Sequence, residues 1–176
     1  GRTISNTIVD AATDAILDAA ANIAGTTVTA LNDATLKALV LSANAISAGH
    51  GAALTGTVQV VGNTVDAVGT ATLIGADLVN NMVAAGIVKA DDASIQNIIG
   101  GAYTSGTTAD LAAVVEIGGV TVQATGAATL TTATGDIVNS TVEGSTVALT
   151  AGGNISNTDV EALTSANLTA TGSIFD

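Results

Sequence analysis

Few side chains in this sequence are of types that could carry out chemistry. The only histidine, His50, lies between Gly49 and Gly51, which is typical of a turn rather than of a catalytic base. The chain has no cysteine, and lysine and arginine together number 3. Cleavage of a polysaccharide would need clustered carboxylates with a basic residue beside them in a cleft. We therefore predict a protein that is not an enzyme and has neither catalytic residues nor a cofactor.

The acidic side chains offer one kind of binding site. Asp91 and Asp92 are adjacent, and Asp10, Asp14 and Asp18 follow one another at intervals of four residues. Carboxylate oxygens are the ligands that Ca²⁺ prefers. However, the Gly-Gly-x-Gly-x-Asp repeat of calcium-binding solenoids is absent. Surface charge is therefore the favoured interpretation, and a calcium site at Asp91 and Asp92 is the alternative.

Pairs of threonines separated by one residue suggest a different surface. Regular ranks of such pairs on a flat sheet could order water and bind ice, but their spacing here is irregular. Threonine that points outward from a β-strand is the simpler interpretation. The pairs are Thr27/Thr29, Thr55/Thr57, Thr70/Thr72, Thr129/Thr131, Thr132/Thr134 and Thr169/Thr171.

The overall charge excludes two classes of partner. Asp and Glu number 15 against 3 Lys and Arg, so the net charge is -12. Three cations cannot provide the counterion release on which nucleic-acid affinity depends, and the same charge repels an anionic membrane surface. No apolar run approaches the roughly 18 residues that span a bilayer. We expect no nucleic-acid binding and no membrane insertion.

A repeat of about 19 residues organises the chain. Residues 136–152 align with residues 154–172 at an offset of 18, which becomes 19 after a one-residue insertion. Residues 4–10 repeat the pattern of residues 155–161, and residues 57–62 resemble 121–126 at an offset of 64. Amides that recur at one coil position can form a ladder of hydrogen bonds. The asparagines spaced by one or two units are Asn6, Asn44, Asn63 and Asn81.

The composition favours stacked strands with a narrow interior. Apolar residues alternate with Thr and Gln in residues 120–124, as in a strand with one buried face. Neither Asn-Gly nor Asp-Gly occurs, so tight antiparallel hairpins lose support. Aromatic residues make up 1%, and small aliphatic side chains can fill only a thin core.

These features predict an all-β fold, a parallel β-solenoid (β-helix) of about nine coils. It forms one domain over residues 1–176, with the clearest repeats in residues 119–176 and a less regular part in residues 84–118. A competing interpretation places a short helix near the N-terminus or in the middle. Residues 8–24, 35–46 and 108–115 favour helix by composition.

The segments STVALTAGGNISNTDV and SANLTATGSI resemble the 19-residue repeats of filamentous haemagglutinin-type adhesins, which are exported by two-partner secretion. The resemblance is clearest over residues 119–176. It implies a right-handed β-helix on the outside of a Gram-negative cell, working in adhesion or surface structure. The secretion-domain motifs and the very long array of that family are not evident, so a chain of this length would have to polymerise to act as a fibre.

We therefore predict a secreted, extracellular structural protein of the cell surface, a subunit that stacks head to tail with copies of itself into a filament or matrix fibre. The first and last complete units look alike, and neither carries a distinct cap. Further expected partners are host or neighbouring cell surfaces. Two alternatives are a solenoid fragment of a large secreted adhesin and an ice-binding solenoid. The expected assembly residues are Ile4, Asn6, Ile8, Val9, Ile155, Asn157 and Val160.

Overall fold

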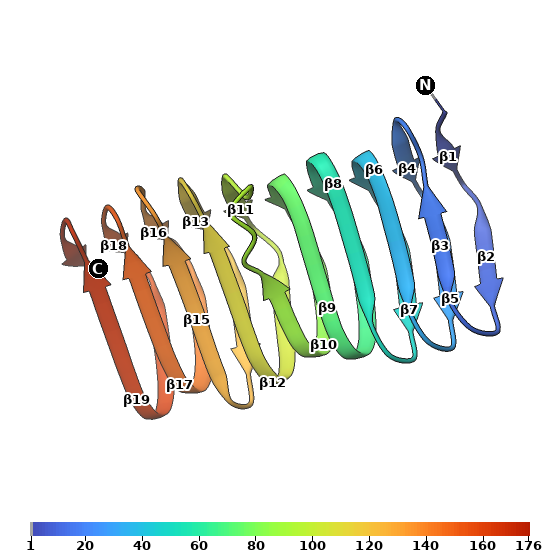
Figure 1. Ribbon diagram of the computed structural model, residues 1–176. Coiled ribbons are helices and arrows are strands. Elements are labelled where there is room, and N and C mark those ends of the chain that lie inside the picture. Colours follow the sequence, from blue (N-terminus) through green and yellow to red (C-terminus); the bar gives the residue numbers. More distant parts are fainter. Residues whose placement is uncertain (1) are drawn as a thin grey trace.

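A computed structural model describes residues 2–176, and in that part of the chain every regular element is a β-strand. Each strand between the two ends pairs in parallel with strands about one repeat before and after it, so the coils lie side by side along a rod with the termini at opposite ends (Figure 1). The strands are β1 (Ile4–Ser5), β2 (Ile8–Ala11), β3 (Ala15–Asp18), β4 (Asn22–Ala24), β5 (Thr27–Ala30), β6 (Ala34–Ser42), β7 (Ala45–Ala48), β8 (Ala52–Val61), β9 (Thr64–Val79), β10 (Met82–Ala90), β11 (Asn97–Ile99), β12 (Ala102–Ala113), β13 (Glu116–Gly118), β14 (Thr121–Ala124), β15 (Ala127–Thr132), β16 (Ile137–Val138), β17 (Thr141–Ala151), β18 (Ile155–Ser156), β19 (Asp159–Ala170) and β20 (Ile174–Phe175).

The predicted parallel β-solenoid with a repeat of about 19 residues is thereby confirmed, and the helical alternative is wrong. Residues 8–24 contain β2, β3 and β4, residues 35–46 lie within β6 and β7, and residues 108–115 enter β12. Helix propensity is a weak preference that packing overrides. In β3 alternate side chains are buried and exposed, which a strand provides and a helix does not.

Three columns of inward-pointing side chains run along the rod and form its core. Along each column, equivalent residues of successive coils lie on paired strands, 18 residues apart from Ile23 to Leu41 and 20 apart from Leu78 to Ile98. The isoleucine column is Ile4, Ile23, Leu41, Val60, Leu78, Ile98, Ile117, Ile137, Ile155 and Ile174. The valine column is Val9, Val28, Ile46, Val65, Val83, Tyr103, Val122, Val142 and Val160. The leucine column is Leu17, Leu36, Leu54, Leu73, Ala90, Leu111, Leu130, Leu149 and Leu168.

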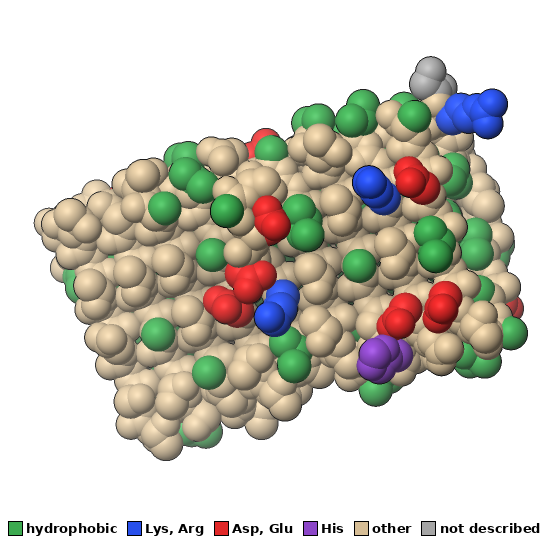
Figure 2. Space-filling model, in the orientation of Figure 1, with side chains coloured by type: hydrophobic (Ala, Val, Ile, Leu, Met, Phe, Trp, Pro, Cys, Tyr) green, Lys and Arg blue, Asp and Glu red, His purple; other side chains and the backbone are tan. Residues whose placement is uncertain are grey.

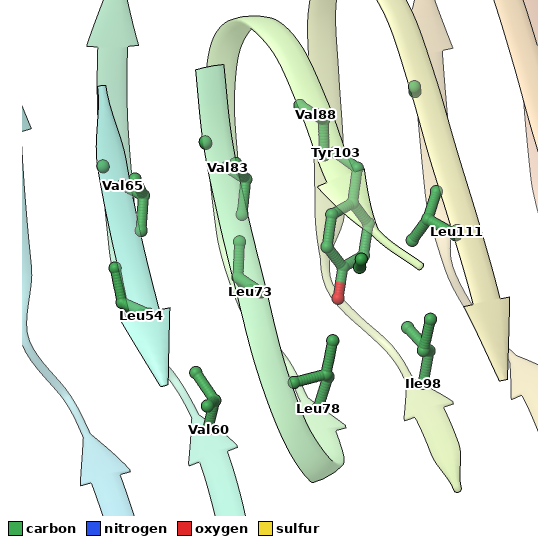
Figure 3. Close-up of a cluster of buried hydrophobic side chains, with 14 of the residues drawn as sticks. Leu54, Val60, Val65, Leu73, Leu78, Val83, Val88, Ile98, Tyr103 and Leu111 are labelled. Atoms are coloured by element: carbon green, nitrogen blue, oxygen red, sulfur yellow. The ribbon is translucent and has the colours of Figure 1, made fainter. Parts of the chain in front are cut away.

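Tyr103 is the one aromatic side chain in this core. It takes a place in the valine column, is fully buried, and its ring points across the bore (Figure 3). The leucine column has its only alanine, Ala90, in the preceding coil. The larger side chains of Met82 and Phe175 are exposed, so the bore is otherwise filled by aliphatic groups, as the composition suggests.

The regular coil is interrupted once, after β10. Residues 91–94 turn outward into solvent, and Ile95 returns to the core with no exposed surface. The amide of Ile95 donates to the carbonyl of Asp92 at 3.0 Å and closes this turn. The insertion therefore leaves the stacking of the columns intact on both sides.

One residue in every coil has a left-handed backbone, just before the strand that carries the valine column. Its φ lies between 46° and 64° in all nine cases. Glycine and asparagine tolerate this conformation best, and eight of the nine positions hold one of them. The left-handed column is Asn6, Gly25, Ala43, Gly62, Asn80, Gly100, Gly119, Asn139 and Asn157.

Ala43, with φ of 51°, is the one residue of the left-handed column that bears the Cβ penalty without a polar side chain to offset it. We predict that Ala43→Gly raises the free energy of unfolding by about 0.5–1 kcal/mol, because relief of the backbone strain outweighs the extra entropy of the unfolded chain. Urea unfolding followed by circular dichroism measures the change. Ala53→Gly, within β8, is the matched control and should destabilise; equal effects of the two substitutions would contradict the account.

Candidate functional site

The N-terminal edge of the rod consists of β1, β2 and β3. These strands pair on one side only, with β4, β5 and β6. Ile4 and Val9 are half-buried, whereas the next members of their columns, Ile23 and Val28, are fully buried. The edge therefore presents unsatisfied backbone groups together with apolar side chains that lack a neighbour.

The C-terminal edge consists of β19 and β20, which pair only with β17 and β18. Val160 and Leu168 are half-buried here, although the column members below them, Val142 and Leu149, have no exposed surface. Ile174 of β20 is 52% exposed. All strands run parallel, and the first and last coils have the same layout. The first coil is open on the side that faces away from the second coil, and the last coil is open on the opposite side (Figure 1).

The predicted assembly residues divide between these edges and the interior. Ile4, Asn6, Ile8 and Val9 all lie in the coil of the N-terminal edge, where the side chain of Ile8 is 82% exposed. They are joined there by Leu17 of β3, which the repeat pattern did not single out.

At the C-terminal edge Val160 is half-buried and Asn157 is exposed, whereas Ile155 is covered. Ile155 is 2% exposed, because Ile174 of β20 covers it. Asn157 belongs to the left-handed column, and its side-chain amide donates to the Asn139 side chain at 3.2 Å. Sequence reasoning missed β20, whose two residues carry little repeat signal of their own.

Three of the four spaced asparagines form the predicted ladder inside the rod. The side-chain oxygen of Asn63 accepts from the backbone and the side-chain amide of Asn44, at 3.1 and 2.9 Å. Asn81 receives the same pair of bonds from Asn63, both at 3.1 Å. These three side chains are at most 2% exposed. Asn6 does not belong to the ladder, because it lies one position earlier, in the left-handed column.

The ladder is structural, since its side-chain amides are satisfied internally. Asn44 donates to the carbonyl of Ile23, and Asn63 donates to that of Leu41. Asn81 donates to the carbonyl of Val60 with one N–H of its side-chain amide. Within residues 2–176 the buried hydroxyl of Tyr103 has no hydrogen-bond partner. Burial raises the pKa of Tyr103.

Asn63→Ala should lower the free energy of unfolding by about 3 kcal/mol, because the buried backbone and side-chain amides of Asn44 lose their acceptor and the carbonyl of Leu41 loses its donor. Urea unfolding of the purified protein measures the loss. Asn167→Ala, at an exposed position of β19, is the matched control and should change stability by about 0.5 kcal/mol or less. A loss at Asn63 as small as that at Asn167 would show that the ladder does not hold the coils together.

The candidate calcium residues lie in the exposed turn after β10. Asp91 and Asp92 are both exposed, and Asp92 accepts a hydrogen bond from the amide of Ser94 at 2.9 Å. Hydrogen bonds from Ser94 lower the pKa of Asp92. Within residues 2–176 no three Asp, Glu, His or Cys side chains converge as metal ligands. Asp10 and Asp18 lie on different strands, β2 and β3, so they do not line one stripe with Asp14.

His50 lies at the surface beside Asp33. Its Nδ1 is 2.8 Å from Oδ1 of Asp33, which also accepts from the amide of Gly51 at 2.8 Å. The hydrogen bonds to His50 and Gly51 lower the pKa of Asp33. The contact between His50 and Asp33 stabilises a turn, in agreement with the interpretation of His50 as a turn residue.

Charged side chains are sparse on the face shown in Figure 2, and the basic side chains visible there lie apart from one another. One mixed group contains Lys89 and Asp110, which are directly paired across β10 and β12. Partial burial and the charge of Asp91 raise the pKa of Asp110, and Lys89 opposes the shift. A carboxyl with a raised pKa binds its proton more tightly in the folded chain than in the unfolded one.

Asp110→Asn should therefore stabilise the protein at pH 7, where wild-type Asp110 is charged at the expense of stability. The gain should shrink as the pH falls through the pKa of Asp110 toward 3, where the wild-type carboxyl is protonated. Urea unfolding at pH 7 and pH 3 tests this difference. Asp66→Asn, at an exposed site of β9, is the control and should show a smaller gain; a variant of Asp110 that is less stable at pH 7 would contradict the argument.

The threonine pairs are not aligned in a single row on one stack of strands. Thr27 and Thr29 lie on β5, in the stack that carries the valine column, whereas Thr129 and Thr131 lie on β15, in the leucine stack. Thr132 is buried. The flat, regular array that an ice-binding face would need is not formed by these residues.

No family model matches the chain, and neither a curated protein nor a solved structure matches it. Within residues 2–176 the structure contains no helix that is long and apolar enough to cross a membrane. The function must therefore be argued from the geometry of the two edges.

Proposed function

We propose that this chain is a non-catalytic structural protein of the cell exterior, a subunit that stacks head to tail into a surface filament or matrix fibre. The observation that carries the proposal is that each end of the rod exposes an unpaired three-stranded coil with the same columns. Ile4, Val9 and Leu17 mark these columns at one edge. Val160 and Leu168 mark two of them at the other.

Contact between the two edges would be heterologous, because different surfaces of each copy meet. The termini lie at opposite ends of the rod, so such a contact leaves both outer edges free and growth continues along the axis (Figure 1). Each joint would pair backbone groups that are otherwise open and cover the half-buried Val9 and Val160. A parallel sheet would then run through the whole filament.

The net negative charge of the subunits opposes this assembly, and the salt concentration sets how strongly it does so. Each copy has a net charge of -12, so like-charged rods repel at low ionic strength. Salt screens that repulsion over about 10 Å at 0.1 M. Both edges carry carboxylates, Asp10 and Asp18 at one and Asp159 and Glu161 at the other, so screening favours assembly under saline conditions such as those outside cells.

The same open edges also favour a second candidate, a segment of a longer secreted adhesin. In that case further coils of one polypeptide would cover both edges, and binding to host or neighbouring cells would occur elsewhere. Sequencing the complete reading frame distinguishes the two, because only the adhesin requires additional repeats that flank these 176 residues.

We predict that the purified chain forms filaments in electron micrographs and that Val9→Asp and Val160→Asp each abolish them, because a charge would be buried in the joint. Each variant keeps one intact edge. A small fraction of either variant should therefore shorten wild-type filaments by capping one end.

The double variant Val9→Asp/Val160→Asp has no intact edge and should not shorten wild-type filaments. Val68→Asp, at a side chain that is 76% exposed, is the matched control and should assemble like the wild type. Circular dichroism checks that all variants are folded. Wild-type protein that stays monomeric at every concentration and salt, or edge variants that assemble normally, would contradict head-to-tail stacking.

A further inference from the structure

The three columns do not have equal numbers of members, and this affects how two copies can join. Within the described residues the isoleucine column extends from Ile4 to Ile174 and has ten members. The valine column, from Val9 to Val160, and the leucine column, from Leu17 to Leu168, have nine each. If each member of a column is called one rank, one copy has one more rank in the isoleucine column than in the valine or the leucine column.

Two copies of these 176 residues consequently cannot pair all three columns at once. If Val9 of an incoming copy pairs with Val160, its Ile4 needs the place on Ile155 that Ile174 already occupies. If Ile4 pairs instead with Ile174, the other two columns are left one rank apart, about 9.6 Å rather than the 4.8 Å of paired strands. A continuous joint requires one of the two terminal strands to leave its place.

β20 is the strand that can leave. It is two residues long, and both of its side chains are more than half exposed. Hydrogen bonds tie it to the coil below, from the amides of Ile155 and Asn157 to the carbonyls of Ser173 and Phe175 at 3.0 and 3.2 Å. The amide of Ser173 also donates to Oδ1 of Asn154 at 2.9 Å. Residues 171–173 join β20 to β19, so β20 can leave while β19 stays paired with β17.

β1 is also the better occupant of that place. Residues 4–7 have the same sequence as residues 155–158, Ile-Ser-Asn-Thr, so identical side chains would stack in register. Asn6 and Asn157 share the left-handed backbone, with φ of 49° and 46°. Asn6 could donate to Asn157 as Asn157 donates to Asn139, and it would enter a hollow lined by Asn157, Thr158, Asp159 and Asp176.

We propose that the joint forms by strand exchange: β1 of an incoming copy displaces β20 and pairs with Ile155–Ser156, and β2 and β3 continue the other two columns. This inference rests on the proposed head-to-tail function. In a free subunit β20 covers the acceptor site and slows assembly. In the joint Asp10 would lie beside Glu161, a like-charged contact that makes exchange salt-dependent.

Because the chain has no cysteine, engineered disulfides can report the register of the joint. Strand exchange places Asp10 and Glu161 of different copies on paired strands, a separation that a disulfide can span. Oxidised filaments of Asp10→Cys/Glu161→Cys should give a covalent ladder on a non-reducing gel. Ser5→Cys/Phe175→Cys reports the register in which Ile4 stacks on Ile174 and should give little or none. The reverse pattern would overturn the inference.

A second pair of variants tests the displacement itself. Ser156 and Phe175 are paired within one copy, so Ser156→Cys/Phe175→Cys should lock β20 in place when oxidised. The locked protein should not assemble, and reduction should restore assembly. Removal of residues 172–176 should accelerate elongation at least about tenfold, because the hydrogen bonds that hold this segment to the coil below no longer have to break.

The outcomes separate this inference from the proposed function. Filaments of the full chain that form equally well with β20 locked, or that elongate no faster without residues 172–176, would overturn strand exchange and leave head-to-tail stacking intact. Assembly of only the truncated chain would support exchange. If neither the full nor the truncated chain assembles in any salt, both proposals fail.

Discussion

The structure depends on one constraint: every coil must return the chain to the same place on the coil before it. Parallel strands give each backbone group a partner only when the register of neighbouring coils matches, and inward side chains meet only then. The left-handed residue from Asn6 to Asn157 sets the turn before each valine-column strand. Coils of 18 to 20 residues are accommodated elsewhere, so the columns stay aligned.

Much of the fold could be predicted from this constraint because it leaves a trace in the sequence. The alignment of residues 136–152 with 154–172 reproduces the structural register, as Ile137 pairs with Ile155 and Val142 with Val160. Buried asparagines at a spacing of 18 or 19 gave the ladder at Asn44, Asn63 and Asn81. Both features arise because equivalent positions in successive coils face the same surroundings.

Other resemblances misled because similar strands occupy different columns. Residues 57–62 resemble 121–126, yet Val58 is 51% exposed whereas its counterpart Val122 is buried in the valine column. Asn6 has ladder spacing but lies in the left-handed column, one residue earlier. An alternating strand looks alike on any face of a solenoid, so periodicity alone does not assign the face.

The candidate site was only half visible in the sequence for a related reason. The match between residues 4–7 and 155–158 located both ends of the stack, but not which residues are uncovered. Ile155 has the right identity and is buried by Ile174, and that could be seen only when the ranks of each column were counted. The proposed function depends on how many members each column has and on which side chains are uncovered at the two edges. Both are properties of the whole rod.

The axial repeat of the assembled filament tests the central claim most directly. A continuous solenoid advances by the nine ranks of the valine column per subunit, about 43 Å at 4.8 Å per rank. Helical reconstruction from electron micrographs measures that distance, and we predict a repeat of about 43 Å with an unbroken 4.8 Å layer spacing. A repeat of ten ranks, about 48 Å, or an assembly in which the rods lie side by side, would contradict a filament built by continuing the columns from one copy to the next.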